Sequence, residues 1–190
     1  EAFLSVHSVS HVVPVIHRDD RTLCNAALQG LDDARLLPAV EGGETRALSV
    51  RQGLERLAPE HPELVLIHDA ARTFVPGTVI EDVISALSHT DGACAALPVV
   101  DALWRSDNGE VGAPVPRDGL WRAQTPQGFR FNRILAAHRA HDGSGADDVA
   151  VAKEAGLTVA LVPGSEQSYK ITTAADLERA RSEVDARETD

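Results

Sequence analysis

The sequence predicts a doubly wound α/β domain, in which helices cover both faces of a mainly parallel sheet. Short apolar runs alternate along the chain with amphipathic stretches of helical period, which is the pattern of repeated strand–helix units. The run Leu64–Ile67 is apolar throughout, as expected for a central parallel strand buried on both faces. The length of 190 residues fits a single domain.

Recognisable residues bound several of the predicted elements. Asp19 or Asp20 can cap the first helix, because an aspartate accepts hydrogen bonds from the free amides of a first helical turn. Pro59 ends the second helix, whose apolar residues recur at helical spacing. Thr173 and Asp176 form a capping-box variant ahead of the last helix. The predicted strands are residues 11–16, 36–40, 64–67, 93–100 and 158–162, and the predicted helices are residues 19–30, 45–56, 77–88, 132–141, 147–155 and 173–187.

The alternation breaks between residues 101 and 126, where turn residues separate short extended pieces. Asn108-Gly109 is typical of a two-residue hairpin turn, so we expect a protruding β-arm over residues 101–126. The alternative to a functional role is an arm that is mostly exposed to solvent and whose Trp121 packs in a dimer interface. The acidic residues 182–190 are expected to form a tail or linker.

Composition and charge exclude several classes of protein. The chain has 18 basic and 29 acidic residues, so its net charge of −11 disfavours binding to nucleic acid or to an anionic membrane. No apolar run is long enough to span a bilayer. Cys24 and Cys94 are isolated, which favours reduced thiols and a cytoplasmic location. The sequence lacks methionine and begins in a helix-like stretch, residues 1–5, so we expect further chain before Glu1.

Ligands of open α/β sheets bind beyond the carboxyl ends of the strands, so polar residues that follow predicted strands are candidate site residues. Gly42 and Gly43 join a predicted strand to a helix and would let the backbone approach an anion or a polar base, with Ser49 one turn into that helix. A plain strand–helix turn is the alternative for this segment.

Three further charged residues occupy such positions. Asp69 follows the strand at residues 64–67 and could bind a metal or a hydroxyl group, or could simply cap the next element. Arg72 could pair with Asp69 or with a phosphate. Lys170 follows the last strand, where an ammonium group can meet a phosphate, although a solvated surface lysine is the alternative. Arg117 on the arm could serve a phosphate in its own subunit or in a neighbouring one.

Other chemistries lack their motifs. The sequence contains no glycine-rich dinucleotide fingerprint, no P-loop and no nucleophile elbow. His138 and His141 share a predicted helix face, but no carboxylate or cysteine completes a metal-binding spacing, so we expect both at the surface.

Six motifs occur in order along the chain: Gly42-Gly43 with Ser49, His68–Arg72, Arg117–Trp121, Gln124–Phe129, Asp147-Asp148 and Lys170–Thr173. Taken together, they resemble the 2-C-methyl-D-erythritol 4-phosphate cytidylyltransferase family. The resemblance covers nearly the whole chain and implies a Rossmann-like nucleotidyltransferase fold whose arm swaps around a dimer partner.

The resemblance implies that the phosphate of methylerythritol phosphate attacks the α-phosphorus of CTP and releases pyrophosphate, with Mg²⁺ or another divalent cation neutralising charge. Arg117 and Lys170 would position the attacking phosphate, with Arg117 acting in the neighbour's site. Asp69 would hold substrate hydroxyls and the metal ion. Further substrate contacts are implied for Arg72 and Thr125, and nucleotide contacts for Gly42, Gly43, Ser49 and Ala70.

The chain also departs from the family pattern. It lacks the family's first strand and the glycine-rich loop that holds the triphosphate, so we expect the 190 residues to form one nucleotidyltransferase domain without those parts. Ala102 and Ala146 replace threonines of the family, so another polyol phosphate, such as ribitol 5-phosphate, is an alternative substrate. A non-catalytic nucleotide-binding module is the other alternative. The composition also suits the first half of a fusion with 2-C-methyl-D-erythritol 2,4-cyclodiphosphate synthase.

Overall fold

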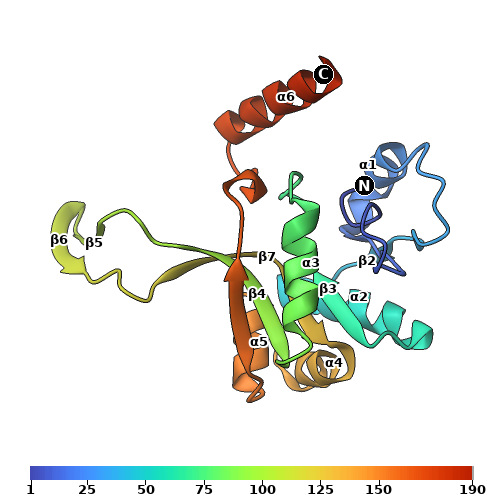
Figure 1. The fold of residues 1–190 in the computed structure, drawn as a ribbon, viewed down its shortest axis with the longest axis horizontal. Coiled ribbons are helices and arrows are strands. Elements are labelled where there is room, and N and C mark those ends of the chain that lie inside the picture. Colours follow the sequence, from blue (N-terminus) through green and yellow to red (C-terminus); the bar gives the residue numbers. More distant parts are fainter. Residues whose placement is uncertain (190) are drawn as a thin grey trace.

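Six strands and the helices that flank them form an α/β body, from which a hairpin and the last helix project (Figure 1). The computed structural model describes residues 1–189. The strands are β1 (Val15–Ile16), β2 (Val40–Glu41), β3 (Leu64–Ile67), β4 (Gly92–Pro98), β5 (Leu103–Asp107), β6 (Glu110–Val115), β7 (Trp121–Arg130) and β8 (Val159–Pro163). The α-helices are α1 (Arg21–Ala27), α2 (Arg46–Leu57), α3 (Gly77–Ala86), α4 (Phe131–Ala140), α5 (Asp148–Glu154) and α6 (Ala174–Thr189).

The largest sheet has the strand order β3-β7-β4-β8. Strands β3, β4 and β8 run in one direction, because β3 and β4 are both antiparallel to β7 and β8 is parallel to β4. A second, parallel pair is formed by β1 and β2. The mainly parallel strand direction predicted from the sequence is confirmed, and β7 is the strand that runs against it.

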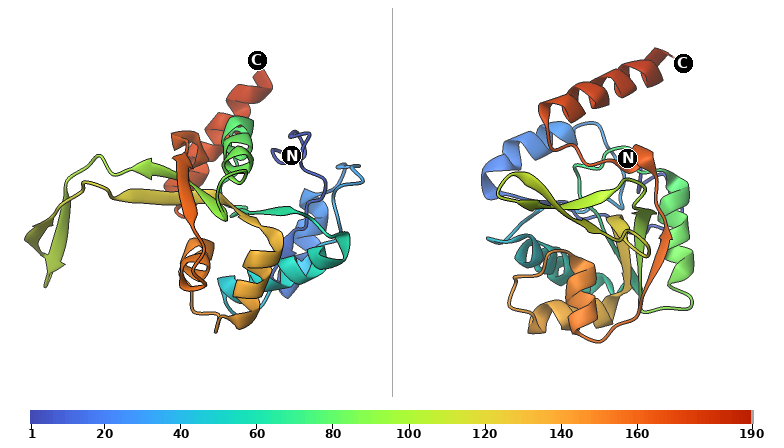
Figure 2. Two further views of the ribbon diagram at one scale, coloured as in Figure 1. Left: turned by 60° about the horizontal axis from the view of Figure 1, so that its bottom comes forward. Right: turned by 90° about the vertical axis from the view of Figure 1, so that its left-hand side faces the viewer.

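Helices cover both faces of the sheet, as predicted. Helix α3 packs on one face through Ile80 and Val83, which are fully buried against β4 and β8. Helices α2, α4 and α5 pack on the other face around Phe129 of β7. Figure 2 shows α3 above the sheet and α4 and α5 below it in the left-hand view. Side chains of β3 alternate between these two faces. Val65 and Ile67 pack on the side of α2, α4 and α5, whereas Leu64 and Leu66 pack on the side of α3.

Strand β7 was not predicted. Its residues 121–126 were assigned to the β-arm, but the whole segment Trp121–Arg130 is a central strand, paired with β3 on one side and β4 on the other. Its sequence contains glutamine, threonine, proline and glycine where an apolar run would be expected. The buried polar side chains are Gln124, Thr125 and Gln127, and each is satisfied by hydrogen bonds rather than by apolar packing.

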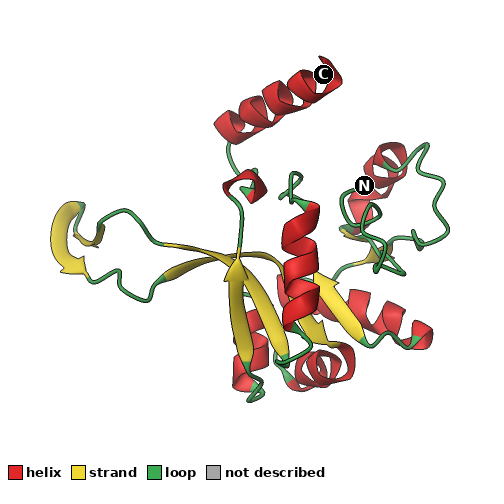
Figure 3. Ribbon diagram, in the orientation of Figure 1, coloured by secondary structure: helices red, strands yellow, loops and turns green. Residues whose placement is uncertain are grey.

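Strands β5 and β6 pair into a hairpin that extends away from the body of the molecule (Figure 3). Its turn is the predicted Asn108-Gly109 pair, and both residues have positive φ angles of 50° and 89°. A two-residue hairpin turn of this kind needs two positive φ angles, which asparagine and glycine tolerate best. The projecting hairpin therefore begins and ends inside the predicted limits of the arm.

The two ends of the chain differ from the sequence-based expectations. Residues 1–5 form turns rather than the end of a helix. Residues 182–189, expected as a tail or linker, continue helix α6, while Asp190 lies outside the described residues. Figure 1 shows α6 in red, standing apart from the sheet.

Candidate active site

The segments that follow β2, β3 and β8 bring three charged side chains together at one edge of the fold. Lys170, in the loop between β8 and α6, donates from Nζ to Asp69 Oδ2 at 2.9 Å. Arg46, in the first turn of α2, donates from Nε to Asp69 Oδ1 at 3.3 Å. The carboxylate of Asp69, directly beyond β3, is thus held by one cation at each oxygen. The prediction that Asp69 and Lys170 share a site is consistent with this geometry.

The electrostatics of Asp69 favour its ionised form. Burial alone would raise the pKa of Asp69, but the hydrogen bond from Lys170 and the charges of Arg46 and Lys170 outweigh burial and lower it below its usual value. Asp69 therefore carries a negative charge at neutral pH. Such a carboxylate can accept a hydrogen bond from a substrate hydroxyl or ligate a hard cation.

Thr125 of β7 and His68 fix the backbone on which Asp69 lies. The N–H of Asp69 donates to Thr125 Oγ1 at 3.0 Å, and the same oxygen lies 3.0 Å from His68 Nδ1. Nε2 of His68 lies 3.1 Å from the carbonyl oxygen of Arg72, which can only accept, so Nε2 carries the proton. Burial lowers the pKa of His68, so the ring is neutral and Nδ1 accepts from the Thr125 hydroxyl.

Arg72 lies at the end of the same loop with part of its guanidinium group unpaired. Its Nη1 donates to the carbonyl oxygen of Ser168 at 2.7 Å, while its buried Nε has no hydrogen-bond partner among the described residues. Burial lowers the pKa of Arg72. A buried donor without a partner is costly, so an oxyanion of a ligand would stabilise this group.

The predicted glycine pair forms a close contact at the start of α2. Thr45 caps this helix by accepting from the N–H of Leu48 at 3.2 Å. The N–H of Gly43 donates to Ser49 Oγ at 3.1 Å. A Cβ atom at Gly42 would lie 2.5 Å from Ser49 Oγ, so a larger residue at this position would displace the Ser49 hydroxyl group. The structure thus brings Gly42, Gly43 and Ser49 together at the N-terminus of a helix, where free N–H groups face outward.

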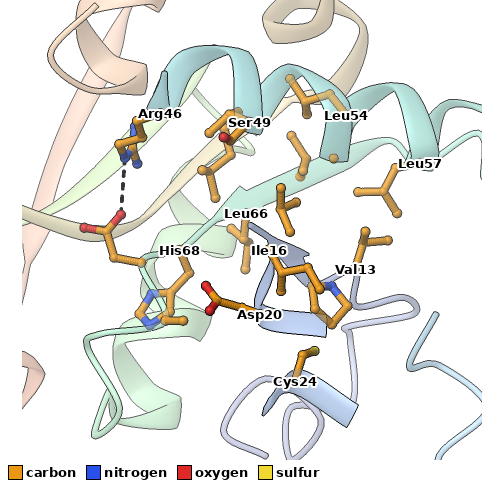
Figure 4. Close-up of a pocket in the computed structure, with 18 of the residues that line it drawn as sticks. Val13, Ile16, Asp20, Cys24, Arg46, Ser49, Leu54, Leu57, Leu66 and His68 are labelled. Carbon is orange, nitrogen blue, oxygen red and sulfur yellow. Dashed lines mark hydrogen bonds and ion pairs between the residues drawn. The ribbon is translucent and has the colours of Figure 1, made fainter. Parts of the chain in front are cut away.

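A cavity of about 750 Å³ lies beside this helix and continues to the end of β3. Figure 4 shows Arg46 and Ser49 on α2 in the upper part of the view, with His68, Ile16 and Asp20 below them. Asp69 and Ala70 also line the cavity, but most of its wall consists of apolar residues of α1, α2, β1 and β3 and of the segment just before β1. The predicted nucleotide contacts Ser49 and Ala70 therefore face a common space with Asp69.

Two buried glutamines of β7 hold the loops of the site, and the sequence did not point to them. Gln124 exchanges hydrogen bonds with the backbone of Ser165, at 3.0 and 3.1 Å, in the segment that leads to Lys170. Gln127 accepts from the N–H groups of Asp148 and Val149, each at 3.1 Å, at the start of α5. Both side chains were parts of a recognised motif, but their role depends on loops that are distant in sequence.

A buried ion pair behind Asp69 was also missed. Asp148 is fully buried; its Oδ2 lies 2.8 Å from Arg46 Nη2 and its Oδ1 lies 3.1 Å from His138 Nε2. The prediction that His138 lies at the surface was wrong, because its side chain is only 1% exposed. His141 is also largely buried and lies 3.1 Å from Glu154, so its predicted surface position was wrong as well. Helical spacing predicts that the two histidines share a face of the helix, but it does not predict whether that face is buried.

Arg117 does not join this cluster. It is exposed, in the segment between β6 and β7, and its described hydrogen bond goes to the carbonyl oxygen of Val100 on the other side of the arm. The remaining predicted site residues, from Gly42 to Lys170, lie around the carboxyl ends of β2, β3 and β8 or on the adjoining part of β7.

The donor set limits what kind of metal site the chain can offer. Among residues 1–189, no group of three or more histidine, cysteine, aspartate or glutamate side chains is arranged to hold a metal ion. Asp69 and Asp20 are the carboxylates among the residues that line the cavity, and Asp148 is buried behind Arg46. One carboxylate together with ligand phosphates is a common environment for Mg²⁺, so Asp69 fits a cation that arrives with a nucleotide.

None of the helices within the described range is long and apolar enough to cross a membrane.

Comparisons with known proteins identify the family. The family model described as 2-C-methyl-D-erythritol 4-phosphate cytidylyltransferase matches residues 1–185. The bifunctional enzyme IspD/IspF of Rhodospirillum rubrum is 54% identical over 179 residues, which cover 94% of this chain and 46% of that protein. The 2-C-methyl-D-erythritol 4-phosphate cytidylyltransferase of Cereibacter sphaeroides strain KD131 is 49% identical, over 94% of this chain and 79% of that protein.

A solved structure agrees with these sequence matches. The crystal structure of 4-diphosphocytidyl-2C-methyl-D-erythritol synthase from Anaerococcus prevotii superposes with a TM-score of 0.83 at 28% identity, over 97% of this chain and 84% of that one. The chain spans about half the length of the bifunctional relatives it matches. Its sequence and its fold together show that the chain belongs to the 2-C-methyl-D-erythritol 4-phosphate cytidylyltransferase family.

Proposed function

We propose that this protein transfers a cytidylyl group from CTP to 2-C-methyl-D-erythritol 4-phosphate. The products are 4-diphosphocytidyl-2-C-methyl-D-erythritol and pyrophosphate, and the reaction belongs to the non-mevalonate route to isoprenoids. The observation that carries this proposal is the contact between Asp69 and Lys170, beside the partly unpaired Arg72, in a chain of this family.

The chemistry explains why these residue types are needed. A phosphate oxygen of methylerythritol phosphate forms a new bond to the α-phosphorus of CTP, and the bond from that phosphorus to the bridging oxygen of pyrophosphate breaks. Both reactants are anions, so the site must neutralise charge and align the two groups. Lys170 supplies a flexible ammonium group for the attacking phosphate, and Arg72 supplies a guanidinium group with a free donor. Asp69 accepts hydrogen bonds from the polyol, with Thr125 beside it.

The cytidine end of CTP is assigned to the start of α2. Gly42 and Gly43 bring backbone close to the base, and Ser49 offers a hydroxyl within the same turn. Ala70 lines the same cavity and would contact the ribose through its backbone. Mg²⁺, or another divalent cation, would be held by Asp69 and the phosphates, where it would neutralise the triphosphate during attack.

We further infer that the arm completes a neighbouring subunit's site in a homodimer. The hairpin exposes large apolar side chains, with Trp104 57% and Val111 75% accessible to solvent, which a partner subunit would cover. Arg117 lies on the arm and outside its own subunit's cluster, which supports action on the substrate phosphate in trans.

A further strand, outside the 190 residues, is proposed to complete the sheet. Among the described residues, β1 pairs only with β2, and β3 pairs only with β7. The apolar cavity lies between their free edges, with Val13 and Val15 on one side and Val65 on the other. A parallel strand seated there would join the two sheets, and its following loop would reach the nucleotide.

Hydrogen exchange tests this missing-strand proposal. In the full-length protein, the outward amides of β3 should exchange slowly, because a neighbouring strand would pair with them. In the isolated 190-residue chain the same amides should exchange fast, and equal exchange in the two proteins would contradict the proposal.

Release of pyrophosphate tests the function itself. Full-length protein with CTP, Mg²⁺ and methylerythritol phosphate should release pyrophosphate, and omission of the polyol phosphate should abolish release. Release with ribitol 5-phosphate alone would assign the sister activity, whereas CTP binding without release would favour the non-catalytic module. Measurement of the intact mass distinguishes a single-domain protein from one fused to a cyclase.

The free Cys24 and Cys94 support a reducing compartment, and we assign the reaction to the cytoplasm.

A further inference from the structure

Arg46 lies between two carboxylates that differ sharply in their surroundings. Its Nε donates to Asp69 Oδ1 at 3.3 Å, and its Nη2 lies 2.8 Å from Asp148 Oδ2. Asp69 faces the cavity, whereas Asp148 is fully buried. Arg46 therefore connects the candidate active site with the interior of the protein.

The inner end of this connection is fixed from several elements. Asp148 begins α5, and its N–H donates to Oε1 of Gln127 on β7 at 3.1 Å. Its carboxylate accepts from His138 of α4 at 3.1 Å, since an ionised carboxylate can only accept. A buried carboxylate needs paired partners, and here they are Arg46 of α2 and His138 of α4, while Gln127 of β7 holds the backbone of Asp148. Asp148 is thus an anchor whose position does not depend on any ligand.

The shape of an arginine side chain suits this bridge. A guanidinium group presents donors in a planar fork, so different nitrogen atoms can serve two carboxylates at once. Burial alone would lower the pKa of Arg46, but Asp148 and Asp69 together raise it above its ordinary value. A lysine at this position could keep the charge beside Asp148, but its single nitrogen would not reach both carboxylates in this geometry.

The second cation on Asp69 has a different character. Lys170 reaches Oδ2 from a loop, and 43% of its side chain is exposed. Under the proposed function, on which this inference rests, Lys170 turns toward the substrate phosphate and leaves Oδ2 of Asp69. Arg46 would then be the cation that still holds Asp69.

We propose that Arg46 is a positioning residue that acts through Asp69. Anchored by Asp148 and His138, it fixes Oδ1 of Asp69, so that Oδ2 is presented to the polyol hydroxyl or to the cation. Arg46 lies in the first turn of α2, one turn before Ser49, so the same helix carries the base contact and orients the carboxylate. Occupation of the nucleotide pocket and the alignment of Asp69 are in this way linked through one rigid element.

The test uses Arg46→Lys in the full-length protein, because this variant keeps a positive charge beside the buried Asp148 and should fold. We expect kcat/KM for the polyol phosphate to fall about 10- to 100-fold, as for other residues that orient a catalytic group. The KM for CTP should change by less than about threefold. Arg56→Lys is the matched control, since Arg56 lies on the same helix in a surface pair with Glu60, and it should match wild type.

A double-mutant cycle separates positioning from a general structural role. In an Asp69→Asn background, Arg46→Lys should cost less than about threefold, because the group through which Arg46 acts is already gone. Equal losses in the two backgrounds would overturn the proposal, as would wild-type kcat/KM in Arg46→Lys itself.

A measurement without turnover keeps the test independent of the proposed function. In nitrogen-15 NMR spectra of the full-length protein, the Nε–H of Arg46 should be ordered and slow to exchange, both in wild type and in Lys170→Ala. In Asp148→Asn it should become mobile, because its anchor is lost. A mobile Arg46 in wild type would overturn the proposal even if the enzyme is active. An inactive wild type with an ordered Arg46 would instead reject the proposed function and retain the bridge.

Discussion

Replacement of Lys170 by alanine separates the chemical role of its ammonium group from its structural role. In the structure, Nζ lies 2.9 Å from Asp69 Oδ2, but the side chain of Lys170 is 43% exposed. A partly exposed ion pair contributes about 0–1 kcal/mol to the free energy of unfolding, and Arg46 still holds Asp69 in the variant. The melting temperature should therefore fall by less than about 4 °C. Loss of a cation that acts on a reacting phosphate should lower kcat by about 10²- to 10³-fold.

The assay is pyrophosphate release by full-length protein at saturating CTP, with thermal melting of the same preparations. Lys153→Ala is the matched control, because Lys153 is the only other lysine in the sequence and is exposed on α5. It should alter neither quantity. The reasoning is refuted if Lys170→Ala keeps kcat within about threefold of wild type. A fall in melting temperature of roughly 10 °C or more would show that Lys170 is structural.

Three further predictions concern pH, subunit exchange and metal binding. Burial lowers the pKa of His68, so below about pH 6.5 the unfolded chain binds more protons than the folded one. The free energy of unfolding should therefore decrease as the pH is lowered, by at most about 1.4 kcal/mol per pH unit from this residue. Chemical denaturation should show a flatter profile for His68→Gln, and an unchanged profile would contradict the assignment. An equimolar mixture of Arg117→Ala and Asp69→Ala subunits should regain about one quarter of wild-type activity if dimers exchange freely and the arm acts in trans; no recovery would reject the swapped arm. Calorimetry should detect only weak Mg²⁺ binding without nucleotide, with Kd above about 1 mM, because Asp69 offers one carboxylate; tight binding to the protein alone would disprove a nucleotide-borne cation.

The repeated strands and helices were predictable because their burial leaves a local pattern. Strand β3 was predicted with its observed limits, since Leu64–Ile67 is buried on both faces and must be apolar throughout. The turn at Asn108-Gly109 was predictable for a different local reason, because it needs residues that tolerate positive φ angles.

Strand β7 could not be predicted, because several of its central buried residues are polar and satisfy their polar groups with hydrogen bonds, so the strand lacks an apolar run. The side-chain amide groups of Gln124 and Gln127 form hydrogen bonds with the loops before Lys170 and α5, which lie some twenty to forty residues further along the chain. The periodicity of apolar residues does not predict hydrogen-bond partners that are so distant in sequence.

The candidate site was predictable where a residue directly follows a strand, as Asp69 does. The bridge from Arg46 to Asp148 was not, because it joins the starts of two helices that are about a hundred residues apart in sequence. His138 shows the same limit: a histidine on a helix is exposed or buried according to what packs on it, and here α5 supplies a buried carboxylate.

Identification of the product tests the central claim most directly. Full-length protein incubated with CTP, Mg²⁺ and methylerythritol phosphate should yield one compound whose phosphorus-31 spectrum contains two mutually coupled diphosphate signals, with pyrophosphate in equal amount. Its mass should equal that of methylerythritol phosphate joined to cytidine monophosphate with loss of water. Hydrolysis of CTP to cytidine monophosphate, or no change in either substrate, would contradict the account.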